Sequence, residues 1–247
     1  SKQQLEPKFF LSAGLRFGGK TASLGTLPGK TLLGIVGDKE SGAKGALKVA
    51  EKLGNQVDVV NIKDGQDMLA VAREAFEAGY DNFAADGLSA ITEVESEKPK
   101  VKKQLNAGGN GVFAGWRAIG NEVVDMIQGL KALSAEYDKP VVLTLALKDP
   151  KADATGNYAA LEADVRGQMA LGYLKGKCAY YVCARAATDN EGNTVYVLQT
   201  APDGLYEARL DGVDADDLPK GFRTQKSKVE EGQPVGWDAL IQFLSNY

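Results

Sequence analysis

The sequence predicts an α/β fold, in which a mostly parallel central sheet is flanked by helices and carries an antiparallel hairpin at one edge. Short apolar segments alternate with amphipathic segments of helix length, which is typical of parallel sheets with crossover helices. Of the 247 residues, 44% are hydrophobic and 25% charged, close to the globular average. A chain of this length can therefore bury a large core without disulfides or metal ions.

The first part of the chain holds four strand-length apolar segments and one clear helix pattern. Between the third and fourth segments, Met68, Ala72 and Phe76 recur at helical spacing and predict a helix over residues 66–77. The expected strands are residues 9–13 (FFLSA), 31–36 (TLLGIV), 57–62 (VDVVNI) and 80–86 (YDNFAAD).

The second part begins with residues 93–111, which are charged and then glycine-rich, so we expect a mobile surface loop there. The segment 141–147 (VVLTLAL) is apolar throughout and predicts a central strand covered on both faces. The other expected elements are a long amphipathic helix over 113–137, a polar loop over 148–167, a hairpin of 178–186 and 194–200 around the turn ATDNEGN, and a short closing helix over 237–247.

Composition excludes several classes of function. The chain contains no histidine, which removes Ser-His-Asp triads, histidine general bases and histidine metal ligands. The net charge of −4 argues against a general nucleic-acid coat, although local basic patches remain compatible with it. We expect Cys178 and Cys183 to be reduced core thiols of a cytoplasmic protein. No apolar run is long enough to cross a membrane and the first residues do not form a secretion signal, so we expect no membrane association.

Residues 14–21 (GLRFGGKT) fit the pattern G-x-x-x-x-G-K-[ST] of a phosphate-binding loop between a strand and a helix. The glycines let backbone amides turn towards phosphate oxygens, while Lys20 would bridge the β- and γ-phosphates of ATP and Thr21 would ligate Mg²⁺. The alternative is a glycine-rich turn with a solvated lysine, and Phe17 is bulky for such a loop. The residues expected to bind the nucleotide are Gly14, Leu15, Arg16, Phe17, Gly18, Gly19, Lys20, Thr21 and Ala22.

Acidic residues and a threonine at strand ends complete the expected catalytic set. Asp86 ends a strand, where it would face the ligand crevice of an open α/β sheet and support Mg²⁺. Glu40 follows residues 31–36 and is our first choice to orient the attacking water, with Asp38 second. Thr144 lies inside a buried strand and needs a polar partner, either the γ-phosphate and its water or a backbone group.

Two basic features are candidates for contacts outside this site. Arg209 would reach the nucleotide of a neighbouring subunit as an arginine finger, or it is an ordinary surface arginine. A basic cluster precedes the AGGNG sequence and is either a DNA-binding segment or a solvated charge run. It consists of Lys98, Lys100, Lys102 and Lys103.

The order and spacing of these segments resemble the phage-type RecA-like AAA ATPases, P-loop NTPases associated with single-strand annealing proteins. The similarity runs through GLRFGGKT, GDKES, AADGLS, GWRAIGNEV, VVLTLALKD, the hairpin and YEARL, roughly residues 8–220. It implies a RecA-like P-loop NTPase core, with residues 1–220 as the ATPase domain and 221–247 as a C-terminal tail. It also implies the same nucleotide-site roles for Lys20, Thr21 and Asp86, and for Glu40 and Thr144.

The resemblance implies an ATP hydrolase that uses ATP and Mg²⁺ and forms a homo-oligomer. It further implies a role in handling single-stranded DNA during recombination in the host cytoplasm, alongside a phage annealing protein. The alternative is a structural or assembly component of a phage particle that keeps a nucleotide site and is associated with the virion. A small-molecule kinase is a second alternative, but its arginines would be clustered, whereas here they are scattered.

Overall fold

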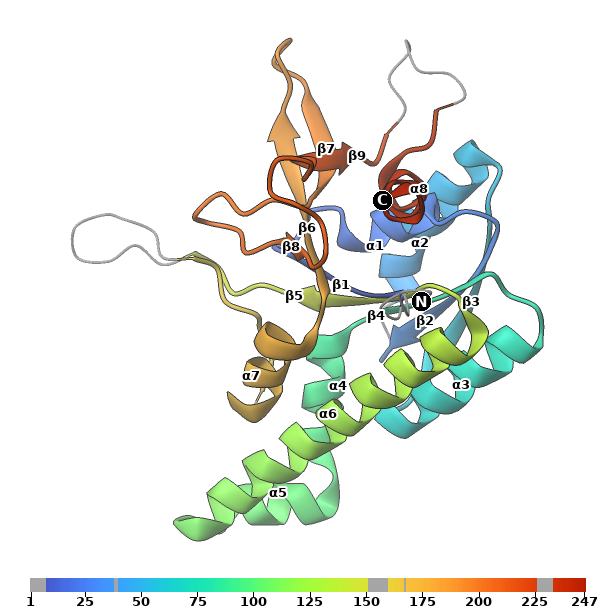
Figure 1. The fold of residues 1–247 in the computed structure, drawn as a ribbon. Helices are drawn as coiled ribbons and strands as arrows, with labels where there is room; N and C mark the ends of the chain where they lie inside the picture. The colour runs from blue at the N-terminus through green and yellow to red at the C-terminus, as the bar shows by residue number, and fades with distance from the viewer. Residues whose placement is uncertain (1–7, 38–39, 151–159, 167, 226–232) are drawn as a thin grey trace, which may run out of the picture.

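The computed structural model describes residues 8–37, 40–150, 160–166, 168–225 and 233–247 (Figure 1). Within these residues the chain forms a nine-stranded sheet in the order β3-β2-β4-β5-β1-β6-β7-β9, with β8 paired to β6. The strands are β1 (Phe9–Gly14), β2 (Lys30–Val36), β3 (Gln56–Ile62), β4 (Asn82–Asp86), β5 (Val141–Ala146), β6 (Tyr180–Thr188), β7 (Thr194–Gln199), β8 (Arg209–Leu210) and β9 (Gly221–Arg223).

Helices cover both faces of the sheet (Figure 1). One face carries α3, α4, α6 and α7, and the other carries α1, α2 and α8. The helices are α1 (Lys20–Ser23), followed by the 3₁₀ turn η1 (Leu24–Thr26), α2 (Glu40–Leu53), α3 (Gly65–Glu77), α4 (Leu88–Glu97), α5 (Pro99–Asn106), α6 (Asn110–Tyr137), α7 (Gln168–Lys177) and α8 (Gly236–Asn246).

The fold class expected from the sequence is confirmed. The six strands that lie side by side in the order β3-β2-β4-β5-β1-β6 are parallel. Strands β7, β8 and β9 add antiparallel pairs at one side. Strand β1 is buried along its whole length and β5 along nearly all of it, because both lie in the middle of the sheet between two helical layers. The expected hairpin is formed by β6 and β7, and the expected helices over 66–77, 113–137 and 237–247 are α3, α6 and α8.

The expectation of a mobile loop over residues 93–111 was wrong. These residues complete α4, form α5 and begin α6. Pro99 occupies the first turn of α5, where proline is well tolerated. Lysine, valine and glutamine can all continue a helix. The high charge of this segment was therefore wrongly interpreted as a sign of a loop. No bounds were predicted for α2 and α7, and residues 151–159 and 167 of the expected 148–167 loop lie outside the described residues.

The C-terminal helix α8 is part of the core. The Trp237 side chain is fully buried and meets the ring of Phe10 from the central strand β1 edge-on, with 5.5 Å between ring centroids. Leu240, one turn further along α8, is also fully buried. The assignment of residues 1–220 to the ATPase domain and 221–247 to a tail stays a prediction. Within the described residues, no helix is long and apolar enough to cross a membrane.

Candidate functional site

The phosphate loop (residues 14–21) leaves the carboxyl end of β1 and turns tightly into α1. The Gly18 amide donates to the Leu15 carbonyl at 3.1 Å, and Gly19 has a φ of 85° at the start of α1. A Cβ on Gly14 would lie 2.3 Å from the Ala184 carbonyl oxygen of β6, and one on Gly18 would lie 2.8 Å from the same atom. Glycine is therefore required because the backbones of the loop and β6 touch.

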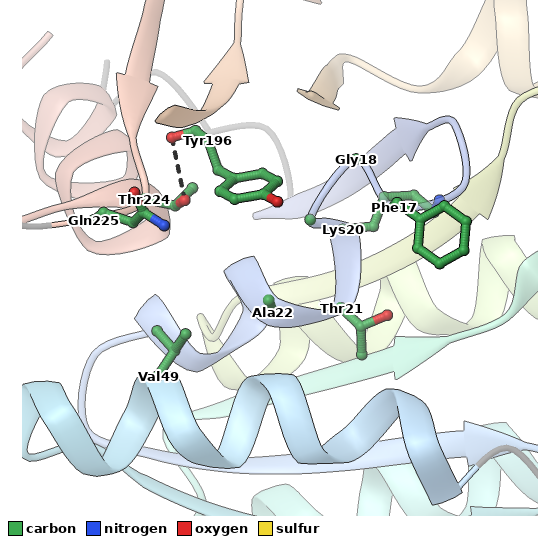
Figure 2. Close-up of a pocket in the computed structure, with 10 residues that line it drawn as sticks. Phe17, Gly18, Lys20, Thr21, Ala22, Val49, Tyr196, Thr224 and Gln225 are labelled. Carbon is green, nitrogen blue, oxygen red and sulfur yellow. Dashed lines mark hydrogen bonds between the residues drawn. The ribbon is translucent and has the colours of Figure 1, made fainter. Parts of the chain in front are cut away.

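Phe17 does not close the loop. Its side chain is 95% exposed and points away from the pocket residues Tyr196 and Val49 (Figure 2). Its φ is 61°, a left-handed conformation that is strained for a bulky residue. The concern raised by an aromatic residue in this loop is therefore removed, because the ring leaves the inner side of the loop accessible.

Lys20 is the first residue of α1, and its side chain turns back over the loop. The ammonium donates to the carbonyl oxygens of Gly14 at 2.7 Å and Leu15 at 2.8 Å. Both acceptors are neutral. A phosphate oxygen in their place would carry a negative charge, so the ammonium would gain an ion pair in addition to the hydrogen bond. The Lys20 ammonium thus lies where it can exchange these carbonyl acceptors for the oxygens of an anion bound in the loop.

Asp86 stands at the centre of a cluster at the carboxyl ends of three strands. It lies opposite Thr144 in the register of β4 and β5, and β5 in turn pairs with β1, which leads into the phosphate loop. Thr21 donates to one Asp86 oxygen at 2.5 Å, and Thr144 donates to the other. The structure therefore brings together three residues that the sequence had singled out separately.

The cluster fits Mg²⁺ in its donor chemistry. Thr21 and Asp86 supply hydroxyl and carboxylate oxygens, the ligands that Mg²⁺ prefers. No group of three or more histidine, cysteine, aspartate or glutamate side chains suited to a metal was found in the described part of the chain. Two protein oxygens suit a Mg²⁺ ion that keeps several waters and binds substrate phosphates, rather than a metal enclosed by the protein.

The residues expected to orient the attacking water lie at the limit of what is described. Asp38 lies outside the described residues. Glu40 begins α2, but its side chain is also outside the described part. The strand before them, β2, pairs with β4, which ends in Asp86, so the chain enters α2 at the same edge of the sheet. Both assignments stay predictions.

Arg209 is not brought to the phosphate loop within the chain. It pairs with Tyr181 near the amino end of β6, and its guanidinium donates to the Cys178 carbonyl at 2.9 Å through Nε. The phosphate loop lies at the opposite, carboxyl end of the parallel neighbour β1. A role towards a neighbouring subunit stays a prediction.

A pocket of about 390 Å³ adjoins the phosphate loop (Figure 2). Its volume is in the range of small-molecule sites. Tyr196 of β7 lies beside the loop so closely that a Cβ on Gly19 would be 2.8 Å from its ring. The walls of the pocket beyond the loop residues are Val49 of α2, Tyr196, Thr224 and Gln225. Sequence reasoning missed these four, because contacts that are distant in sequence bring them to the loop: the packing of α2 beside α1 for Val49, and the strand pairing of β6, β7 and β9 for the other three.

The two cysteines are buried and free, as expected. Burial raises the pKa of the Cys178 thiol to about 11 and that of the Cys183 thiol to about 12. Nucleophilic and redox chemistry both require the thiolate, which is scarce at neutral pH with such values. The thiols therefore belong to the core.

Comparison with known proteins gives a likeness of fold only. No protein-family model matches this chain, and no curated protein matches it in sequence. Among the solved structures that match is the crystal structure of the RadB recombinase. The chain is 17% identical to it with a TM-score of 0.42, over 81% of this chain and 86% of that one.

Proposed function

We propose that this chain is a RecA-like ATPase that binds and hydrolyses MgATP. The observation that carries the proposal is the joint placement of Lys20, Thr21 and Asp86 around the glycine-rich loop at the carboxyl ends of β1 and β4. Ligands of open α/β sheets bind at this edge. The loop sequence matches the phosphate-binding pattern at every fixed position.

The triphosphate would be held mainly by the loop itself. Helix α1 is only four residues long, so its dipole contributes little. The loop amides and the Lys20 ammonium would supply most of the attraction, with Lys20 exchanging the Gly14 and Leu15 carbonyls for phosphate oxygens. Mg²⁺ would supply charge neutralisation on the transferring phosphoryl group, with Thr21 as ligand and Asp86 holding its shell.

The nucleoside would occupy the pocket next to the loop. Tyr196 and Val49 offer aromatic and aliphatic walls for a flat base, and the Gln225 amide offers a donor and an acceptor for its polar edge. Hydrolysis requires a group that orients water, which we assign to Glu40 at the start of α2. Thr144 acts through Asp86, because its hydroxyl is bonded to that carboxylate.

The same proposal assigns the ATPase to the handling of single-stranded DNA in recombination, in a homo-oligomer of phage type. This part rests on the order of the sequence segments described above. Arg209 of one subunit would then act on the nucleotide of the next.

The deciding experiment measures binding of ATP to the wild-type chain and to Lys20→Ala by calorimetry with Mg²⁺ present. We expect micromolar binding by the wild type and a loss of at least 100-fold in the variant, because a charge-assisted phosphate contact is removed at the centre of the site. Circular dichroism checks that the variant is folded. Unchanged affinity in a folded Lys20→Ala protein contradicts the site.

Phosphate release in the same samples separates the proposal from its alternative. Turnover that disappears in Lys20→Ala supports an ATPase. Tight ATP binding with no turnover by any oligomer of the wild type instead favours a structural component of a phage particle with a retained nucleotide site. A single assay series therefore distinguishes a failed site from a site that binds without hydrolysing.

A further inference from the structure

Helix α5 and the first three turns of α6 (residues 99–120) form a two-helix arm that projects from the body of the molecule (Figure 1). The two helices touch closely, since a Cβ on Gly115 would lie 2.7 Å from the Leu105 side chain. Val101 of α5 is buried as well. The arm is therefore a defined helical hairpin rather than a loose loop.

Two aromatic rings are exposed on this arm. Phe113 is 73% exposed and Trp116 is 37% exposed. Their spacing of three residues places them on one face of α6, and Arg117 shares this face at a spacing of four from Phe113. Single exposed apolar residues are ordinary. Two large rings and a guanidinium side by side on a projecting helix form a surface suited to a ligand.

The arm is also the most basic segment of an acidic protein. Residues 98–121 contain Lys98, Lys100, Lys102, Lys103 and Arg117 and no acidic residue, whereas the whole chain has a net charge of −4. Lys98 pairs with Glu95 at 2.8 Å, and Lys102 pairs with Glu97 at 2.5 Å. No ion pair of the other three was found among the residues that the structure describes. Three exposed positive charges thus remain available on the same arm as the rings.

We propose that this arm binds a single-stranded polynucleotide, with bases stacked on Phe113 and Trp116 and phosphates bound by Lys100, Lys103 and Arg117. Aromatic rings next to cations are the combination by which proteins hold single strands without reading sequence. The inference rests on the proposed function, which includes the handling of single-stranded DNA, and it names the part of the molecule that would bind that DNA. It does not depend on the ATP site.

The shape and chemistry of the arm favour a single strand over the other polyanions and over protein. A duplex keeps its bases stacked within itself and offers phosphates to the cations but no free base to the rings. A stable protein interface needs about 800 Å² from each partner, and the exposed parts of the two rings supply less than half of that area. An extended strand can follow such a surface because each base needs only one ring.

The test uses the full-length protein and fluorescein-labelled (dT)30, with binding followed by anisotropy at fixed salt, both without nucleotide and with MgATP. We expect Phe113→Ala/Trp116→Ala to weaken binding by roughly tenfold for each ring removed. We expect Lys100→Gln/Lys103→Gln/Arg117→Gln to reduce the slope of log affinity against log salt by about 2. Circular dichroism and ATP affinity should stay as in the wild type.

Tryptophan fluorescence reports the contact directly. The chain has two tryptophans, and Trp237 is fully buried, so quenching by unlabelled (dT)30 must come from Trp116. We expect quenching and protection from acrylamide on binding. A 30-base-pair duplex should neither quench nor protect Trp116. Parallel titrations with (rU)30 show whether the strand is DNA or RNA.

Matched controls remove the same chemistry elsewhere on the surface. Lys52→Gln/Lys177→Gln/Lys220→Gln deletes three exposed charges away from the arm, and Leu47→Ala deletes an exposed apolar side chain. Neither should change (dT)30 affinity beyond twofold. If the charge control and the arm variant lose affinity for (dT)30 equally, the proposal is overturned, because the DNA would then bind to positive charge anywhere on the surface.

Two other results also overturn it. One is a wild-type protein that does not bind (dT)30 with or without MgATP. The other is a ring variant that binds as tightly as the wild type but loses self-association in sedimentation, which would assign the face to a second copy of the chain. Loss of ATP binding in Lys20→Ala is measured separately, so a failure of the ATP site and a failure of the arm are distinguishable.

Discussion

At the residue scale, the most informative group is the Asp86 carboxylate, because both of its oxygens are occupied by threonine hydroxyls. Thr21 comes from the phosphate loop and Thr144 from the strand between β4 and β1. Side chains alternate between the two faces of a sheet along each strand, and this alternation places Asp86 and Thr144 on the same face. Asp86, Thr144 and the buried Ser12 of β1 point to the sheet face that α1 covers. The hydroxyls thus hold the carboxylate towards the loop before any ligand arrives.

This arrangement predicts a specific effect of Thr144→Val. The change keeps the shape of a side chain that is 1% exposed but removes one donor to Asp86. We expect the free energy of unfolding to fall by about 1–2 kcal/mol and the affinity for MgATP to fall several-fold, because the carboxylate is no longer oriented. Affinity for ATP without Mg²⁺ should hardly change. Urea titration and calorimetry with and without Mg²⁺ measure both quantities.

Thr31→Val is the matched control for this prediction. Thr31 is equally buried in β2, two strands away from β5, where its hydroxyl accepts from the Asn82 amide at 3.2 Å, remote from the carboxylate. It should cost a similar amount of stability without any Mg²⁺-dependent effect. Equal loss of MgATP affinity in the two variants would mean that Thr144 has no role beyond packing.

Part of the site was predictable from sequence at this scale, and part was not. The phosphate loop is contiguous, so its spacing alone identifies Lys20 and Thr21. Asp86 and Thr144 were found because each is a polar residue in or at the end of an apolar strand. Tyr196 and Gln225 were not found, because their position depends on how β7 and β9 pair, and no local pattern encodes that pairing.

At the element scale, α1 is too short to be stable without contacts to other elements. A four-residue helix followed by a 3₁₀ turn has little intrinsic stability. The C-terminal helix α8 supplies support: the Trp237 indole donates to the Ser23 hydroxyl at 3.2 Å, and Ser23 donates to the Lys20 carbonyl at 2.6 Å. The Trp237 amide also donates to the Thr26 hydroxyl at 2.8 Å. The end of the chain is thereby bonded to the helix that begins at the phosphate loop.

A double-mutant cycle tests this support. Trp237→Phe keeps a large ring beside Phe10 and removes the indole donor, and Ser23→Ala removes its acceptor. We expect each to lower the free energy of unfolding by about 1 kcal/mol or more, and the pair to be non-additive by at least 0.5 kcal/mol, because they share one bond. ATP affinity should fall a few-fold in both. Urea unfolding of the four proteins measures the cycle, and strict additivity would show that the bond is energetically neutral.

Helices α4 and α5 show why local composition misled at this scale. The glutamates and lysines of residues 93–103 resemble a solvated run, but several of them pair along and between the helices, as Lys98 does with Glu95 and with Asp64 at 3.6 Å. Val101 is the only apolar residue of α5 that is buried among the described side chains. A helix with so narrow an apolar stripe gives almost no periodic signal.

At the scale of the whole molecule, two apolar cores lie on opposite faces of one sheet. Phe9, Leu11 and Ala13 of β1 face one core, and Phe10 faces the other, so the central strand contributes to both. The second core is completed by Trp237 and Leu240 from α8. Alternating inward residues on a doubly covered sheet could be predicted from the apolar strands. The closure of one core by the last helix could not, because it is a contact across most of the chain length.

This closure predicts that residues 221–247 unfold together with the rest of the chain rather than as a separate tail. Trp116→Phe leaves Trp237 as the single tryptophan, so its fluorescence follows α8 while far-UV circular dichroism follows all helices. We expect both signals to give one urea midpoint and one slope, because removing a buried tryptophan from a core costs about 3–5 kcal/mol, a large share of the stability of a domain. A fluorescence midpoint at clearly lower urea would make the segment an independent tail. The truncated chain 1–220 is a second test of the same prediction. It should lose both cooperative unfolding and ATP binding. The phosphate loop sequence is intact in this chain, but α1 and the turn after it lose the hydrogen bonds from Trp237.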